Sequence, residues 1–280
     1  MEVKIIVDSL RYEEKLIVNE FKKHNIPYRI VLTSTLSLDF IDLNDISNLI
    51  LMRSPSYFKN KLIAEYYQLS NCFVFNSFSI IDLFGNKLKT DIWLKQNNIR
   101  LIPTRNCFAI ENALVEARKI GYPIVAKPLI GGFGELVHLV QSEREFKQLL
   151  EIYKKFAPAT HKMIYYQKKI DIKKDIRVIT LGTDIIASVI RTNIIFKKNI
   201  AAGGISTNYS LNETENKFIK EIINLIWTDA FLGIDLLVDK NNNYYICDIN
   251  PVCLFKDAIK ASGINIAEIL VKFLITKVGI

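Results

Sequence analysis

One candidate anion site combines a lysine at the end of an apolar run with a glycine-rich stretch. Lys127 ends the run IVAK, and Gly131, Gly132 and Gly134 follow in IGGFGE. Because glycine has no Cβ, backbone N–H groups in such a loop can approach an anion closely, and the lysine adds a positive charge beside them. The pattern indicates a site for ATP phosphates, although it is not a Walker A loop. The alternative is a solvated lysine before a glycine turn.

A second set supplies oxygen ligands from two neighbouring predicted strands. Asp235 lies in GIDLLVD, and Asp248 and Asn250 lie in CDIN. Carboxylate and amide oxygens are the hard ligands that Mg²⁺ prefers, with nucleotide phosphates and water filling the remaining positions. We therefore predict that these side chains bind one or two magnesium ions. The alternative is a pair of structural aspartates at strand ends near a turn.

A third set contains two arginines on further predicted strands, Arg177 in KDIRV and Arg191 in VIRTN. The planar guanidinium binds phosphate oxygens as a fork and stays charged. An inward-pointing arginine beside a magnesium site can therefore stabilise a phosphoryl group during transfer. The alternative is an ordinary surface ion pair, such as Asp175 with Arg177.

The composition indicates a globular protein with a large core. Half of the 280 residues are hydrophobic, 24% are charged, and the formal net charge is +8, which excludes a disordered chain. No arginine-rich run or interleaved basic and aromatic stripe is present, so no nucleic-acid partner is expected. The four cysteines show no C-x-x-C pairing and are expected to be buried free thiols. Without an apolar run of about 18 residues or a signal-like start, we expect a cytoplasmic protein without a membrane span.

The elements that must position these sets divide the chain into three expected domains. Residues 1–85 alternate short apolar strands with helices, which predicts a Rossmann-like parallel sheet, here without a G-x-G-x-x-G fingerprint. A small α+β domain is expected at 86–162, and a second α+β domain with the magnesium set at 163–280. A hairpin is expected between Leu237 and Tyr245 because the residues between the two flanks favour turns.

The individual elements follow from hydrophobic periodicity and turn residues. The predicted strands are 3–7, 28–32, 49–52, 72–75, 124–129, 136–140, 164–167, 175–181, 184–190, 233–239 and 244–250. The predicted helices are 12–24, 59–69, 87–98, 110–119, 142–156, 213–227 and 266–276.

In this order the motifs resemble those of the ATP-grasp ligases. The resemblance rests on Lys87 in LFGNKLKT, Lys127-Pro128 before IGGFG, Tyr166-Gln167 before a D-I-R strand, Arg191, the segment NIAAGG at 199–204, Asp235, and Asp248-Ile249-Asn250. Within the ATP-grasp ligases the chain looks most like the RimK-type branch. Specifically, it looks like the LysX and ArgX ligases, which attach an amino acid to an amino-group carrier protein. The likeness covers nearly the whole chain, from VDSLRYEEKLI to LFKDAIKASGINIAEIL.

The resemblance implies an ATP-grasp fold, with α/β and α+β parts, that holds ATP between the central and C-terminal domains. The implied nucleotide-binding residues are Lys87, Lys127, Gly131, Gly132, Gly134, Gln167, Lys168, Ile170 and Asp171. By the same likeness, Mg²⁺ binds Asp235, Asp248 and Asn250, and Arg177 and Arg191 stabilise the γ-phosphoryl and acyl-phosphate groups. The residues implied for the acceptor amino acid are Asn199, Gly203, Gly204 and Asn208.

The implied activity is ATP-dependent amide-bond formation, in which a carboxylate becomes an acyl-phosphate and an amine then displaces the phosphate. The resemblance implies that glutamate or 2-aminoadipate is joined to the C-terminal glutamate of a small acidic, LysW-like amino-group carrier protein. This step would belong to lysine or arginine biosynthesis, and the enzyme would be a homodimer or homotetramer. The charge of +8 agrees with an acidic partner. The alternatives are a cofactor or ribosomal-protein tail as the carboxylate donor, or a weakly catalytic nucleotide-binding regulator.

Four positions depart from the pattern of these ligases. Asp248 and Lys168 each stand where glutamate is usual, and Asp171 is a possible substitute for the latter. Ala202 stands where arginine is frequent, and Leu254 where glutamate is usual. These departures concern the metal geometry, the adenine or ribose contact, and the acceptor specificity.

Overall fold

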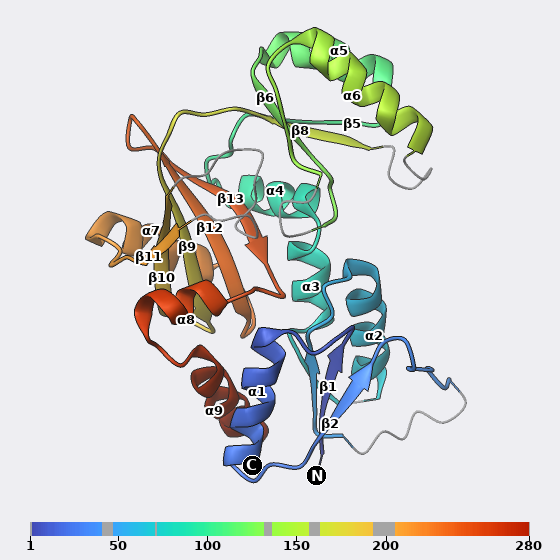
Figure 1. Cartoon of the computed structure of the whole chain (residues 1–280), viewed down its shortest axis with the longest axis vertical. Helices are drawn as coiled ribbons and strands as arrows, with labels where there is room; N and C mark the ends of the chain where they lie inside the picture. Colours follow the sequence, from blue (N-terminus) through green and yellow to red (C-terminus); the bar gives the residue numbers. More distant parts are fainter. Residues whose placement is uncertain are drawn as a thin grey trace.

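The computed structural model describes residues 2–40, 47–70, 72–131, 136–156, 163–192 and 205–279. Within these ranges the strands form three sheets, one after another along the long axis of the molecule (Figure 1). We refer to them as the N-terminal, central and C-terminal sheets.

The N-terminal sheet is parallel throughout, as predicted. Its strands in spatial order are β2 (Tyr28–Leu32), β1 (Val3–Val7), β3 (Leu49–Met52) and β4 (Phe73–Phe75). All of β1 is buried, because helix α1 (Tyr12–Lys23) packs on one face of the sheet and α2 (Tyr57–Leu69) on the other. A short helix, α3 (Phe78–Phe84), follows β4 and leads out of this sheet.

The central sheet is antiparallel and is covered by two helices. Its strands in spatial order are β5 (Thr104–Cys107), β8 (Ile164–Lys168), β6 (Ile124–Lys127) and β7 (His138–Val140). Helices α5 (Ile110–Ile120) and α6 (Glu143–Phe156) bury their apolar stripes against it (Figure 1). The boundary expected at 162 therefore separates β8 from the strands that it pairs with, and the division into domains stays a prediction.

The C-terminal sheet is the largest and carries the hairpin expected between Leu237 and Tyr245, which lie opposite each other. Its strands in spatial order are β11 (Ile205–Asn208), β10 (Asp184–Thr192), β9 (Ile172–Leu181), β12 (Phe231–Asp239) and β13 (Tyr244–Asn250). Helix α7 (Glu213–Asn224) and Trp93 of α4 (Lys87–Gln96) contribute to the core on one face of this sheet. The opposite face is left to the candidate site and the N-terminal part of the chain.

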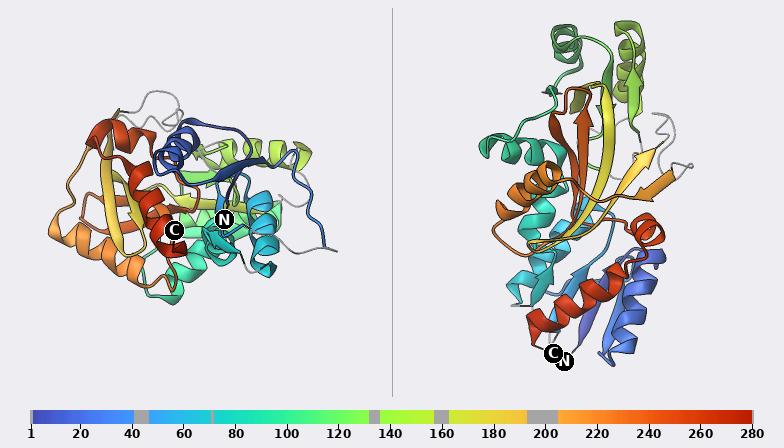
Figure 2. Two further views of the ribbon diagram at one scale, coloured as in Figure 1. Left: turned by 90° about the horizontal axis from the view of Figure 1, so that it is seen from below. Right: turned by 90° about the vertical axis from the view of Figure 1, so that its left-hand side faces the viewer.

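The two ends of the chain share one core. After α8 (Lys256–Ser262), the last helix, α9 (Ile266–Val278), packs alongside α1. Both helices contribute to the cluster that also contains residues of the N-terminal and C-terminal sheets. Figures 1 and 2 show α1 and α9 side by side, with both termini at the end of the molecule opposite the central sheet.

Most elements lie where periodicity placed them, and the missed ones are short. The elements that were not predicted are α3, α8, β5 and β11, none of which exceeds seven residues, a length at which periodicity gives little signal. The described cysteines are free thiols as expected, although Cys247 is only partly buried. No helix in the described ranges is long and apolar enough to cross a membrane.

Candidate active site

The candidate residues of the C-terminal sheet project from one face. In an antiparallel sheet, residues opposite each other share a face, and so do residues two apart along a strand. Arg177 lies opposite Asp235, and Asp235 lies opposite Asp248. Asn250 is two residues beyond Asp248 and therefore points the same way. The pairing thus gathers an arginine and all three predicted magnesium ligands on one side of the sheet.

Asp235 is the centre of a largely buried ion-pair cluster. Its Oδ1 lies 2.9 Å from Arg191 Nη2 and 3.1 Å from Arg177 Nη1. Arg191 also donates to Asp175 Oδ1 from Nε, at 2.9 Å, and from Nη2. These four side chains are only 11% to 18% exposed. The alternative of a surface pair between Asp175 and Arg177 therefore does not describe them, since Asp175 bonds Arg191 away from solvent.

The cluster keeps Arg191 charged. Burial by itself would lower the pKa of Arg191, but the carboxylates of Asp235 and Asp175 outweigh burial and raise this pKa above its usual range. Burial also raises the pKa of Asp175, and Arg191 counteracts that only in part. A phosphoryl group that reaches this guanidinium must therefore compete with two carboxylates for its N–H groups.

A β-bulge turns two successive residues of β13 toward the site. Leu236 lies opposite Ile246, whereas Asp235 lies opposite Asp248, so Cys247 is an extra residue on β13. Bulges bend a strand locally and can re-aim side chains next to active sites. Here the bulge aims Cys247 at the central sheet, where Lys127 Nζ lies 3.4 Å from its Sγ.

Two predicted phosphate-binding lysines approach the site from the central part of the chain. Lys127 is the last residue of β6. Burial would lower the pKa of Lys127, but Cys247, Asp248 and Asp91 outweigh burial and raise it, which secures its positive charge. Lys87 is the first residue of α4, and its Nζ donates to the carbonyl of Gly131 at 3.0 Å. Lys87 is thereby tied to the start of the glycine-rich stretch.

The side chains predicted for the adenine end are held in different ways. Gln167 is 3% exposed, and its Nε2 donates to Tyr165 Oη at 2.8 Å and to Thr104 Oγ1 at 3.2 Å. Lys168 donates to the carbonyls of Gly121 and Tyr122, each at 3.0 Å, directly beyond the C-terminal end of α5. A cation is favoured there by the helix dipole, so the lysine that replaces the usual glutamate serves the fold of the central sheet.

The neighbouring residues of this connection lead into the C-terminal sheet. Ile170 is partly buried in a small cluster with Ile102 and Tyr245. The carboxylate of Asp171 is 70% exposed and lies 3.8 Å from Lys240 Nζ. Asp171 thus lies in solvent, beside the exposed side chain of Lys240.

The remaining predicted residues concern the acceptor and the glycine-rich stretch. Asn208 ends β11 and lies opposite Val189, which lies opposite Arg177, so Asn208 is on the face of the site. Five of the predicted site residues lie outside the described ranges. They are Gly132, Gly134, Asn199, Gly203 and Gly204.

The oxygen donors suit Mg²⁺ in number and kind. Within the described ranges no group of three or more His, Cys, Asp or Glu side chains is placed to hold a metal ion. Mg²⁺ does not require such a cage, because it is usually bound through one or two carboxylates together with water and substrate phosphates. Asp235, Asp248 and Asn250 match that donor set. Both arginines contact Oδ1 of Asp235, and neither is bonded to Oδ2.

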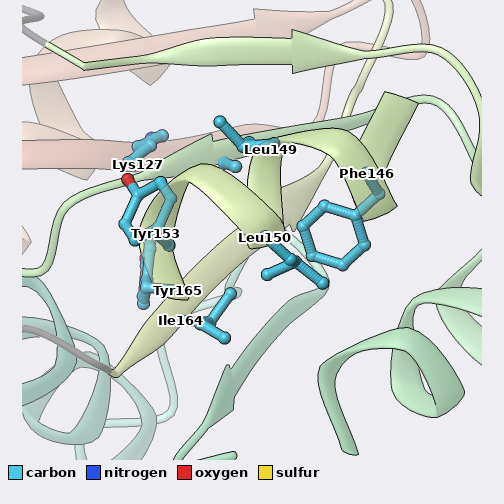
Figure 3. Close-up of a pocket in the computed structure, with 8 residues that line it drawn as sticks. Lys127, Phe146, Leu149, Leu150, Tyr153, Ile164 and Tyr165 are labelled. Carbon is cyan, nitrogen blue, oxygen red and sulfur yellow. The ribbon is translucent and has the colours of Figure 1, made fainter. Parts of the chain in front are cut away.

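A small cavity lies beneath α6, next to the lysine of β6. Apolar side chains of α6 line it, and Lys127, Tyr153 and Tyr165 lie at one end (Figure 3). Its volume is about 10 Å³, which is the space of a single water molecule. This cavity is too small for a nucleotide.

Three hydrogen-bonded side chains beside Lys127, those of Gln167, Tyr165 and Asp91, were not predicted as a connected group. Tyr165 Oη receives a hydrogen bond from Gln167 and donates to Asp91 Oδ2 at 2.7 Å. Burial raises the pKa of Asp91 to about 6, while the hydrogen bond from Tyr165 and the charge of Lys127 oppose this rise. The available signal was spacing, since Asp91 follows Lys87 by four residues and so shares its face of α4.

Asp91→Asn is expected to stabilise the protein at pH 8 and to have little effect near pH 4. The native pKa is raised from 3.8 to about 6, so ionised Asp91 disfavours the native state above pH 6, and this penalty disappears as the pH falls toward 4. The gain at pH 8 is at most about 3 kcal/mol, by the equivalence of pKa shift and free energy. Urea unfolding of both proteins at pH 8, 6 and 4.5 measures it.

Asp184→Asn is the matched control, because the Asp184 side chain is 77% exposed. It should change the free energy of unfolding by no more than about 0.5 kcal/mol at each pH. A gain from Asp91→Asn that is the same at all three pH values would contradict the buried ionisation.

Comparison with known proteins gives matches along nearly the whole chain. The sequence profile of the RimK-like ATP-grasp domain matches residues 85–274. The Glutamate–LysW ligase ArgX of Sulfurisphaera tokodaii is 27% identical over 278 residues, with 98% of each chain covered. The Alpha-aminoadipate–LysW ligase LysX of the same organism is 26% identical over 279 residues, with 96% of each chain covered.

Two solved structures show the same arrangement of elements. A RimK domain ATP-grasp protein from Sphaerobacter thermophilus has a TM-score of 0.82 at 18% identity, covering 98% of this chain and 99% of that one. The D-alanine–D-alanine ligase from Bacillus anthracis, complexed with ATP, has a TM-score of 0.73 at 17% identity, covering 99% of this chain and 97% of that one.

Proposed function

Because the chain belongs to the RimK-like ATP-grasp family, we propose that it is an ATP-dependent ligase that joins glutamate or 2-aminoadipate to a LysW-like carrier protein. The family and the ATP-grasp fold expected from the motifs are confirmed. The proposed bond is an amide between the amino group of the amino acid and a carboxylate of the C-terminal glutamate of the carrier. The similarity to LysW ligases over nearly the whole chain supports this substrate class and a role in lysine or arginine biosynthesis.

The observation that carries the proposal is the cluster around Asp235. Two arginines converge on one carboxylate, 2.9 and 3.1 Å from its Oδ1, on the face of the sheet that also presents Asp248 and Asn250. A purely structural ion pair does not need a second arginine or two further oxygen ligands beside it. Phosphoryl transfer needs both, because the anionic phosphate must be neutralised and positioned.

We assign the following roles within this proposal. Lys127 and Lys87 bind phosphate oxygens of ATP from the central part of the chain. Arg177 and Arg191 bind the γ-phosphoryl group and then the acyl-phosphate, which keeps the transferred group beside the incoming amine. Magnesium, when bound by Asp235 and its two neighbouring ligands on β13, would neutralise phosphate charge.

The reaction proceeds in two balanced steps. The carboxylate of the donor attacks the γ-phosphorus of ATP, and the bond between γ-phosphorus and bridging oxygen breaks to release ADP. The amine of the acceptor then attacks the acyl carbon and expels inorganic phosphate, with loss of a proton from nitrogen. Neither step requires a covalent bond to the protein, so positioning and charge neutralisation account for the catalysis.

ADP release with ATP and Mg²⁺ tests this proposal. The assay compares glutamate with 2-aminoadipate, each with and without a carrier protein that ends in glutamate. We expect turnover only when the carrier and one of the two amino acids are both present, and mass spectrometry of the carrier should show the added amino acid. ADP release that ignores the carrier but responds to another carboxylate would contradict the proposed donor.

A further inference from the structure

The segment that follows the magnesium ligands is held by the N-terminal part of the chain. It runs from Pro251 to Lys256, directly after β13, whose arrow points toward the N-terminal sheet in Figure 1. Arg53 Nη2 donates to the carbonyl of Cys253 at 3.1 Å. Glu13 Oε1 accepts from the backbone N–H groups of Phe255 and Lys256, at 3.2 and 3.1 Å. A third contact, from Asn76, lies closest to the magnesium ligands.

Asn76 bridges the first residue of β12 and the residue after β13. Its Nδ2 donates to the carbonyl of Phe231 at 2.8 Å and to the carbonyl of Pro251 at 2.7 Å. Its Oδ1 accepts from the N–H of Phe231 at 2.7 Å. The side chain is 3% exposed, and both of its amide donors and its acceptor are used by the backbone of these two strands.

The position of Pro251 explains why a side chain is needed here. Pairing between β12 and β13 continues to Gly233 opposite Asn250. The chain then turns at Pro251 and Val252, so the ladder ends before Val252 can lie opposite Phe231. The buried backbone of Phe231 would then lack partners on that side, at a cost of roughly 1 to 3 kcal/mol for each group. The amide of Asn76 takes the place of the missing strand.

The bridge lies next to catalytic parts of the proposed site. Asn250 immediately precedes Pro251, and Gly233 lies two residues after Phe231. A Cβ on Gly233 would lie 2.6 Å from Cβ of Cys253 and 3.0 Å from Nη1 of Arg177. Cys253 of the segment and Arg177 therefore both lie close against Gly233, where no side chain would fit.

We propose that Asn76 is a positioning residue for the magnesium site. By binding both strands at once, it fixes the end of β13 relative to β12 and so the separation of the Asn250 and Asp235 side chains. The sheet that carries the metal ligands is thus completed by a residue that directly follows β4 of the N-terminal sheet, 155 positions away from Phe231. The proposal rests on the proposed function, because it concerns the same metal ligands.

The test compares Asn76→Ala and Asn76→Ser with the wild-type protein in ADP binding. Calorimetry with and without EDTA gives the affinity for metal-free ADP, and a Mg²⁺ titration at fixed ADP gives the half-saturating Mg²⁺ concentration. For Asn76→Ala we expect that concentration to rise roughly tenfold or more, as for other residues that orient metal ligands, with metal-free binding little changed. Asn76→Ser keeps one hydroxyl donor and should give a smaller rise.

Asn60→Ala is the matched control. Asn60 is also buried, at 1% exposure, on α2 of the same N-terminal part. It should lower the urea midpoint without changing the Mg²⁺ requirement. An unchanged half-saturating Mg²⁺ concentration in a folded Asn76 variant would overturn the positioning role and leave only a structural one. The proposed function is tested separately in the wild-type protein. If ADP binding by the wild-type protein did not depend on Mg²⁺, both the proposed metal site and the proposed function would be wrong.

Discussion

Asp235→Asn is expected to reduce the kcat of ADP release by roughly 10²- to 10³-fold, the loss seen when one preorganised electrostatic group is removed from a transition state. The carboxylate of Asp235 forms ion pairs with Arg177 and Arg191, at 3.1 and 2.9 Å. Asparagine keeps the shape but removes the negative charge that aligns both guanidinium groups and that would bind Mg²⁺. Coupled-enzyme assay of ADP release at saturating ATP measures the effect.

Asp239→Asn provides the control on the same strand. Asp239 accepts hydrogen bonds from the backbone N–H groups of Asn241 and Asn243, each at 2.8 Å, in the hairpin turn. The change should alter kcat by no more than about twofold, as for positions away from the chemistry. Wild-type turnover in Asp235→Asn would remove this residue from the metal site and from the reaction.

Arg191→Lys is expected to lower kcat by roughly 10²-fold, although the charge is conserved, because an ammonium group cannot reproduce the fork of a guanidinium. Nε and Nη2 of Arg191 bind Asp175, and Nη2 also reaches Asp235 at 2.9 Å. Lysine has a single nitrogen in place of Nε and Nη2, so it cannot reproduce the two bonds to Asp175 and the contact with Asp235 together. Single-turnover ADP formation separates this loss from any change in product release.

The same substitution at a surface position is the control for Arg191→Lys. Arg118 forms a forked pair with Glu143, with Nε and Nη2 each at 2.7 Å, but its side chain is 58% exposed. Exposed pairs contribute no more than about 1 kcal/mol, so Arg118→Lys should leave kcat unchanged. If Arg191→Lys behaved like Arg118→Lys, the fork of Arg191 would have no role in phosphoryl transfer.

The long elements of the fold could be predicted because their sequences repeat one pattern many times. The helices Tyr12–Lys23 and Glu143–Phe156 are examples. Elements such as α8 and β11 could not be predicted in this way, since seven and four residues carry too few repeats of either period. Strand β11 forms because it pairs with β10, and α8 forms because it packs Ala258 into the core that α1 and α9 share.

The site was predictable in its residue types and less so in its connections. Motif order placed Arg177, Arg191 and Asp235 in one site, and the strand register brings them within hydrogen-bonding distance. The contribution of Asp175 was not predicted, because a sequence does not show which of two nearby arginines a carboxylate will bind. Asn76 was also missed, since its partners are backbone groups far along the chain.

The bulge at Cys247 also sets which changes of length β13 can tolerate. Removing Cys247 would restore regular alternation and leave Asp248 opposite Asp235, with Ile246 still opposite Leu236. Removing Ile249 would instead turn Asn250 toward the apolar face, because each one-residue step along a strand reverses its side chain. The site can thus tolerate the deletion of Cys247 at the bulge but not the deletion of Ile249. Related chains are therefore expected to differ in length at position 247 and to keep the D-x-N spacing of the two ligands on β13.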